Sequence, residues 1–354
     1  MTDSQEPIQL TAYAHGAGCG CKIEPKVLKT MLQQAQALPV HPNLLVGNQT
    51  NDDAAVYDLG NNQALIATTD FFTPIVNDAF DFGRIAAANA ISDVYAMGGK
   101  PLMALAILGW PVNKLPATLA GKVLEGAREI CNSLNIPLAG GHSIDSQEPI
   151  FGLSVNGLVA ISNLKKNSGA KAGDFIFITK PIGTGVLSTA QKRQHLKEED
   201  YKAFVKQLCT INTFGATLGN KSFVHALTDI TGFGLLGHLH EMAEGSGLSA
   251  EISYVAIPIM PNVEHYLALN CIPDATYRNW NAYSSDTLID AEVNPMQSFQ
   301  LLPDPQTNGG LLFAVDAGHV EEMQTCMRAH GLHDYCQPIG KFTLPGEKRI
   351  HVKK

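Results

Sequence analysis

The pattern of apolar and polar residues along the chain predicts a mixture of strands and helices. Short apolar runs that end in polar residues or glycines are typical of buried strands, and they occupy residues 64–72, 101–110, 150–161, 175–179 and 309–316. Helical spacing of apolar residues covers 26–38, a helix of small residues closed by two glycines covers 81–99, and 226–247 indicates a short strand end, a glycine-rich turn and a helix. Because strands and helices do not alternate regularly, we expect an α+β fold.

The polar and glycine-rich segments between these elements suggest how the chain is divided. A chain of 354 residues is long enough for two domains. Residues 162–174 are polar and turn-rich, which is typical of a boundary. We expect a mobile arm over 1–23, a first domain over 24–160 and a second domain over 171–354.

Composition favours a folded cytoplasmic protein over a nucleic-acid-binding, secreted or membrane protein. Hydrophobic residues make up 45% of the chain, so a substantial core can be buried. The net charge of −8 and the lack of a long Lys/Arg run argue against a nucleic-acid partner. The polar start is unsuited to a signal peptide, and the longest apolar run is too short to span a membrane. Seven scattered cysteines favour reduced thiols in a cytoplasmic protein.

The segment "HGAGCGCK" (residues 15–22) combines thiols, glycines and a lysine. It fails as a phosphate-binding P-loop because Cys21 stands where the second glycine should be. A zinc site built from His15, Cys19 and Cys21 is disfavoured, since C-x-C is tighter than the usual spacing and no second cysteine pair exists. An ordinary loose terminus does not explain two cysteines among glycines. We favour a reactive thiol, because Lys22 promotes the thiolate and the glycines let the arm close over a ligand.

Several aspartates stand at turns or in apolar surroundings. Asp52 and Asp53 precede an apolar run, Asp70 ends one, and Asp229 precedes a glycine turn. Each alone is typical of an exposed turn or cap. Asp93, however, lies in an apolar helix, where a carboxylate needs a partner or a metal. Carboxylates converging beside a triphosphate would hold Mg²⁺.

Two further motifs have more than one interpretation. The glycines at 232, 234 and 237 match the dinucleotide fingerprint, but residues 223–229 make a poor strand and Glu251 opens the next strand instead of closing it. We therefore disfavour dinucleotide binding. His142, in a glycine-marked loop, is either a buried structural imidazole or a ligand contact, and the sequence leaves both open.

Seven segments together resemble the selenophosphate synthetase (selenide, water dikinase) family. They are "HGAGCGCK", "NDDAAVYDLG", "TTDFFTP", "NAISDVYAMGGKP", "AGGHSID", "TDITGFGLLGH" and "DPQTNGG", in the family order. The family belongs to the aminoimidazole ribonucleotide synthetase superfamily, with thiamine monophosphate kinase and a hydrogenase maturation factor. The thiol arm sets this chain apart from those relatives. The resemblance implies a two-domain α+β fold of that superfamily with a flexible Gly/Cys-rich N-terminal arm.

The resemblance also implies an activity and its site. The expected reaction is ATP + selenide + water → selenophosphate + AMP + orthophosphate, in a cytoplasmic homodimer that uses Mg²⁺ and K⁺. Cys19 matches the catalytic cysteine, which is selenocysteine in some members, and Lys22 matches an essential lysine at the nucleotide. The metal positions are Asp53, Asp93 and Asp229. The remaining ATP positions are Thr50, Asn51, Asp52, Asp70 and Asp93, with Gly141, His142 and Ser143 reaching ATP across the dimer.

The chain departs from the family pattern at one position, and two alternative functions remain. The family usually has "DPQTSGG", whereas Asn308 replaces the serine here, and we expect a tuned contact without loss of activity. Cys19 could bind selenium, accept it from a selenium-delivery protein or position selenide. The alternatives are another ATP-dependent enzyme of the superfamily, which would lack the thiol arm, and a non-catalytic selenium or metal carrier, which would not need the aspartates.

Overall fold

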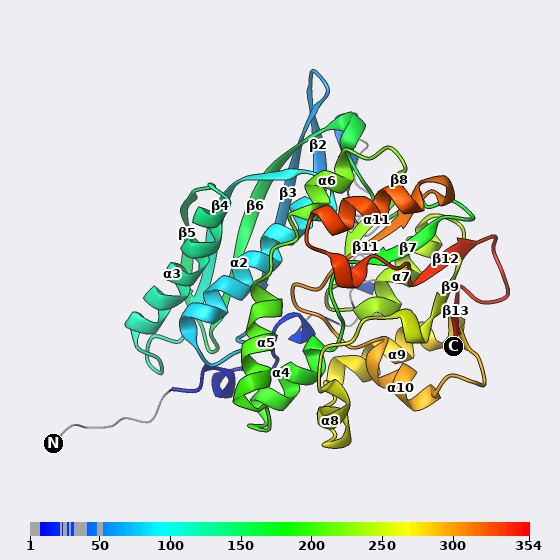
Figure 1. The fold of residues 1–354 in the computed structure, drawn as a ribbon. Coiled ribbons are helices and arrows are strands. Elements are labelled where there is room, and N and C mark those ends of the chain that lie inside the picture. The colour runs from blue at the N-terminus through cyan, green and yellow to red at the C-terminus, as the bar shows by residue number, and fades with distance from the viewer. Residues whose placement is uncertain (1–7, 22, 24–26, 28–29, 32–40, 48–51) are drawn as a thin grey trace.

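A computed structural model describes residues 8–21, 23, 27, 30–31, 41–47 and 52–354. Lys22, Thr50 and Asn51 lie outside the described residues, as does nearly all of the helix expected over 26–38. The part of the chain that is described forms two sheets with helices packed on and between them (Figure 1). None of its helices is long and apolar enough to cross a membrane.

The first sheet has six strands in the order β1-β2-β3-β6-β4-β5. Their bounds are β1 Leu44–Val46, β2 Ala55–Gly60, β3 Gln63–Phe72, β4 Lys100–Trp110, β5 Leu138–Asp145 and β6 Ile150–Ala160. Strands β4 and β5 are parallel, and the other neighbours are antiparallel. The apolar runs expected at 64–72, 101–110 and 150–161 are therefore strands, and β5 lies at an edge.

Helices α2 (Ala79–Ala96) and α3 (Ala117–Ser133) pack against each other beside this sheet. The small residues of α2 allow this close packing: a Cβ added at Gly83 would lie 1.9 Å from the Val123 carbonyl oxygen. The other side of α2 meets the second half of the chain, where a Cβ added at Gly215 would lie 2.2 Å from the Tyr95 carbonyl oxygen. Helix α2 is thus buried between the first sheet and the second half (Figure 1).

The second sheet has seven strands in the order β10-β13-β9-β12-β7-β11-β8. They are β7 Phe175–Ile178, β8 Val224–Asp229, β9 Ser249–Ser253, β10 Thr287–Ile289, β11 Leu311–Val315, β12 Gly340–Thr343 and β13 Ile350–Lys353. The helices are α4 Thr184–Lys192, α5 Glu198–Cys209, α6 Phe214–Gly219, α7 Gly234–Gly245, α8 Val263–Ala268, α9 Asp274–Tyr283, α10 Pro295–Leu301 and α11 Val320–Ala329. Short 3₁₀ turns are η1 Leu10–Tyr13, η2 Cys19–Cys21, η3 Ile161–Asn163, η4 Tyr254–Ala256, η5 Ser284–Asp286, η6 Ala317–His319 and η7 His333–Tyr335.

The expectation that residues 223–229 make a poor strand is wrong. Residues Val224–Asp229 form β8, which is buried and pairs with β11 in antiparallel fashion. The dinucleotide interpretation still fails, for a topological reason. Three strands lie between β8 and β9, the strand that follows α7, so the parallel β-α-β unit that the fingerprint requires is not formed.

Candidate active site

Three aspartates from distant parts of the chain meet where the two halves join. Asp53 precedes β2, Asp93 lies on α2 and Asp229 ends β8. Each carboxylate accepts a hydrogen bond from a hydroxyl: the Thr228 Oγ1 donates to Asp53 Oδ1 (2.8 Å), Thr68 Oγ1 donates to Asp93 Oδ2 (2.5 Å), and Ser92 Oγ donates to Asp229 Oδ2. The site therefore gathers hard oxygen ligands.

The pKa of Asp53 indicates that the negative charges of the three aspartates are not balanced by nearby positive charges. Burial, followed by the charges of Asp229 and Asp93, raises the pKa of Asp53 well above its usual value. Its Oδ2 is buried and has no hydrogen-bond partner among the residues that the structure describes. Negative groups crowded in this way are stabilised by a bound cation, and oxygen ligands suit Mg²⁺.

A chain of hydrogen bonds links Cys19 to Asp70 through Asn89, which lies one turn before Asp93 on α2. The thiol is 1% exposed, and its Sγ donates to Asn89 Oδ1 at 3.3 Å. The Asn89 Nδ2 donates to Asp70 Oδ2 at 2.6 Å, so the Asn89 amide joins Cys19 to a carboxylate at the end of β3. The Cys19 backbone N–H donates to Thr307 Oγ1 at 2.9 Å. The structure thus brings Cys19, Asp70 and the loop around Thr307 together.

The "DPQTNGG" loop (residues 304–310) supports the thiol from the second half of the chain. The Asn308 N–H donates to Asn89 Oδ1 at 2.7 Å, so the same oxygen receives both the thiol and this amide. The Gln306 Oε1 accepts the N–H groups of Gly183 and Thr184 at the start of α4, both at 3.1 Å. The loop therefore connects the thiol to the beginning of α4.

Lys180 is a buried cation behind the same loop. Its Nζ donates to the carbonyl oxygens of Thr210 (2.7 Å) and Asn308 (2.8 Å). Burial lowers the pKa of Lys180 to about 7, and the charge of Asp229 opposes this effect. Lys180 thus fixes the loop and adds positive charge on the side of the aspartates.

The remaining expected site residues lie elsewhere or are not described. Gly141, His142 and Ser143 lie on the edge strand β5, exposed, and β5 is three strands away from β3. The interpretation of His142 as a buried imidazole is therefore wrong. Asp52 Oδ1 accepts the Asn167 N–H at 2.8 Å, which ties it to the segment between the two sheets. Lys22, Thr50 and Asn51 stay predictions, since they lie outside the described residues.

A second group with metal-ligand geometry lies apart from this site. Atoms of Asp174, His225 and Asp316 lie within 4.8 Å of one another. The His225 Nδ1 is 2.8 Å from Asp174 Oδ2, and its Nε2 is 3.1 Å from Lys171 Nζ. Because a lysine and a carboxylate already contact both ring nitrogens, the group is satisfied as a polar network.

Comparison with known proteins identifies the family of this chain. The family model described as AIR synthase related protein, N-terminal domain, matches residues 51–159, and the C-terminal domain model matches residues 171–353. A selenide, water dikinase of Shewanella baltica (strain OS185) is 54% identical over 351 residues, covering 98% of this chain and 97% of that protein. Another, from Shewanella sp. (strain ANA-3), is 53% identical over 346 residues, covering 97% and 96%. This chain belongs to the selenide, water dikinase family.

Solved structures show that the selenide, water dikinase fold of this chain is shared more widely. Thiamine-monophosphate kinase from Stenotrophomonas maltophilia K279a has a TM-score of 0.62 at 19% identity, covering 92% of this chain and 94% of that one. The E. coli hydrogenase maturation protein HypE has a TM-score of 0.61 at 21% identity, covering 92% of each. The expected family and the two-domain fold of the superfamily are therefore confirmed.

Sequence reasoning missed several residues that contact the site. Asn89 was detectable, because it is a polar residue in an apolar helix one turn before Asp93. Thr307 lies in the DPQTNGG motif but was not singled out within it, and Lys180 gave no signal, since a lysine after an apolar run is typical of a surface turn. Their role depends on contacts with segments far away in the sequence.

Proposed function

We propose that this chain makes selenophosphate by the reaction ATP + selenide + water → selenophosphate + AMP + orthophosphate. The observation that carries the proposal is the Cys19 thiol, which is hydrogen-bonded to Asn89 and through it linked to the Asp70 carboxylate. Asn89 lies one turn of α2 before Asp93. A soft thiol suits selenium chemistry, whereas carboxylates suit a metal–phosphate group. The kinase name of the relatives supports ATP as a substrate. So do the related structures solved with AMPPCP and TMP and with ATP.

Asp53, Asp93 and Asp229 are the proposed metal ligands. The orphaned Asp53 Oδ2 and the raised pKa of Asp53 fit a bound cation. Mg²⁺ would neutralise the phosphate charges there, with K⁺ as a further cation. Phosphoryl transfer depends mainly on positioning and charge neutralisation, so these aspartates and Lys180 would supply much of what the reaction needs.

The thiol arm would do the selenium chemistry. We infer that Cys19 binds or positions selenide, or receives selenium from a delivery protein, and that Lys22 supplies positive charge to the phosphates. Residues 1–23 would act as a mobile arm over domains at 24–160 and 171–354. Its seat against Asn89 and Thr307 corresponds to a closed arm that excludes water from the reaction.

A homodimer would complete the nucleotide site. The face of the first sheet opposite α2 carries exposed apolar side chains of Tyr57, Phe71, Met103 and Leu105. Exposed apolar surface of this kind is typical of protein interfaces. The exposed edge strand β5 would then bring Gly141, His142 and Ser143 to the partner's ATP. We place the enzyme in the cytoplasm, since free thiols are found at Cys131, Cys209, Cys271, Cys326 and Cys336.

Phosphorus NMR under anaerobic conditions tests the proposal. The protein with ATP, Mg²⁺, K⁺ and selenide should produce selenophosphate, AMP and orthophosphate. Cys19→Ser should abolish selenophosphate while ATP binding remains, and Cys131→Ser, a buried cysteine in α3, is the matched control. ADP as the final product, or selenophosphate made equally well by Cys19→Ser, would contradict the proposed reaction or the role of Cys19, respectively.

A further inference from the structure

The residues around Cys19 are mostly glycine and alanine, so few of their side chains can form contacts that fix the arm. Between Ala14 and Gly20 the arm contains three glycines and two alanines and makes only an isolated β-bridge and the start of a short 3₁₀ turn. Its backbone carbonyl groups are not satisfied by a helix or sheet, so they need external donors. The donors that the structure supplies come from two cations of the second half.

Lys192, the last residue of α4, holds the arm before Cys19. Its Nζ donates to the carbonyl oxygens of Ala14 (2.8 Å), His15 (2.8 Å) and Gly16 (3.3 Å). An ammonium group has three N–H bonds, so these three carbonyls use all of them. Hydrogen bonds from a charged donor are stronger than neutral ones, which makes this contact the principal attachment of the arm to α4.

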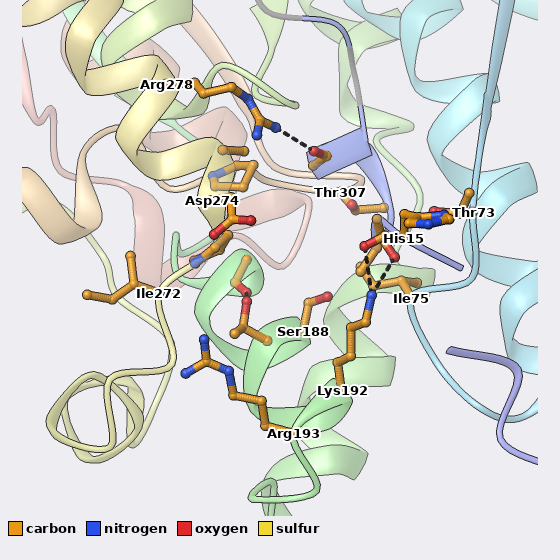
Figure 2. A pocket seen from close by; sticks show the side chains of 18 of the residues that line it. His15, Thr73, Ile75, Ser188, Lys192, Arg193, Ile272, Asp274, Arg278 and Thr307 are labelled. Carbon is orange, nitrogen blue, oxygen red and sulfur yellow. Dashed lines mark hydrogen bonds between the residues drawn. The ribbon is translucent and has the colours of Figure 1, made fainter. Parts of the chain in front are cut away.

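Arg278, on α9, holds the arm after Cys19. Its Nη2 donates to the Gly20 carbonyl oxygen at 3.1 Å. The arm and these helices line a cavity of about 720 Å³, and Figure 2 shows Lys192 and Arg278 reaching the arm from different sides of it. The thiol-bearing segment is therefore held by a cation on each side of Cys19.

The first half of the chain contacts the same segment. The Gly18 N–H donates to the Thr73 carbonyl oxygen at 3.1 Å, and the His15 ring bonds to Glu148. Partial burial lowers the pKa of Lys192, and the charges of Glu148 and Asp274 oppose this effect. Both halves of the chain therefore hold the segment around Cys19.

We propose that Lys192 is a positioning residue that fastens the arm so that Cys19 is seated against Asn89, with Arg278 as its second support. The proposal rests on the proposed function for the catalytic role of Cys19, but the attachment itself is a structural property. Removing the ammonium leaves three carbonyls without their donor and shifts the arm toward an open state in which Cys19 meets solvent.

Alkylation of individual cysteines measures this opening. Wild type, Lys192→Met and the control Lys202→Met, an exposed lysine on α5, are treated briefly with iodoacetamide, and each cysteine is quantified by mass spectrometry. Cys19 should react about 10-fold faster in Lys192→Met, a fold-change that corresponds to one lost charged contact. The buried Cys131 should keep its rate in all three proteins. An unchanged Cys19 rate would overturn the proposal.

A second variant covers the case in which Lys192→Met loosens the whole protein and Cys131 reacts faster too. Lys192→Arg keeps the charge and the long stem, but its planar fork cannot direct three donors to carbonyls that converge on one point. It should raise the Cys19 rate by a smaller factor and leave Cys131 unchanged. A Cys19 rate equal to wild type in Lys192→Arg would then overturn the proposal.

Turnover separates this proposal from the proposed function. Lys192→Met should lower kcat for selenophosphate and leave the KM for ATP near wild type, because Lys192 contacts the arm and not the aspartates. If Cys19 becomes accessible and selenophosphate formation is unchanged, the attachment stands and the catalytic role of Cys19 falls. If accessibility is unchanged and Cys19→Ser still abolishes selenophosphate, the role of Cys19 stands and the attachment falls.

Discussion

Asn308 replaces a serine that is usual in the family, and the structure shows what the larger side chain contributes. The residue is fully buried with φ +47°, a left-handed conformation that asparagine tolerates better than serine does. Its Nδ2 donates to the carbonyl oxygens of Leu208 (2.6 Å) and Thr210 (2.9 Å). Both acceptors lie at or just beyond the end of α5, so Asn308 caps that helix.

The cost of Asn308→Ser follows from these contacts. A serine hydroxyl is shorter and has one hydrogen to donate, so it cannot bridge both carbonyls. The Thr210 oxygen keeps Lys180 as a donor, whereas the Leu208 oxygen loses the bond from Nδ2. One or two lost hydrogen bonds at about 1 kcal/mol each, and a few tenths for the backbone conformation, predict a destabilisation of about 1–2 kcal/mol.

Urea unfolding followed by tryptophan fluorescence measures this difference. The matched control is Asn135→Ser, because Asn135 is exposed with a similar φ of +56° and isolates the backbone contribution. We expect selenide-dependent turnover of Asn308→Ser to remain near wild type, since the contact with Asn89 comes from the backbone N–H of residue 308. A loss of stability no greater than that of Asn135→Ser would refute the capping role.

The other predictions concern pH, metal and assembly. Burial raises the pKa of Asp304 to about 8, so the native state binds more protons than the unfolded state. The stability that results is fully present at low pH and is lost as the pH rises toward 8. The stability of wild type relative to Asp304→Asn should fall by about 1.4 kcal/mol per pH unit between about pH 5 and 7 in urea unfolding, and a constant difference would count against this. Saturating Mg²⁺ should raise the Tm of wild type by roughly 4 °C in a thermal shift assay and that of Asp53→Asn by much less; equal shifts would remove Asp53 from the metal site. Sedimentation velocity should show a dimer at micromolar concentration that Phe71→Lys dissociates, and a monomeric wild type would exclude the proposed interface.

Local patterns were sufficient to predict many elements and the chemical class of the site. Strands β3, β4 and β6 and helix α2 follow the apolar runs closely, because the apolar side chains of these segments are the ones that become buried. The family motifs pointed to Cys19 and to Asp53, Asp93 and Asp229 because phosphoryl and thiol chemistry need those residue types. What these residues could not reveal was their mutual geometry.

The tertiary structure decided the features that depend on contacts between distant segments. The local sequence of β8 is a weak strand pattern because Ala226 and Asp229 are disfavoured in strands, yet the pairing with β11 and burial against its neighbours override it. The Cys19–Asn89 hydrogen bond joins residues 70 positions apart, and the bond from Lys192 to the Ala14 carbonyl spans 178. Such contacts arise only when both sheets are assembled around α2, because the chain topology and not the local sequence brings α2, α4 and the arm together.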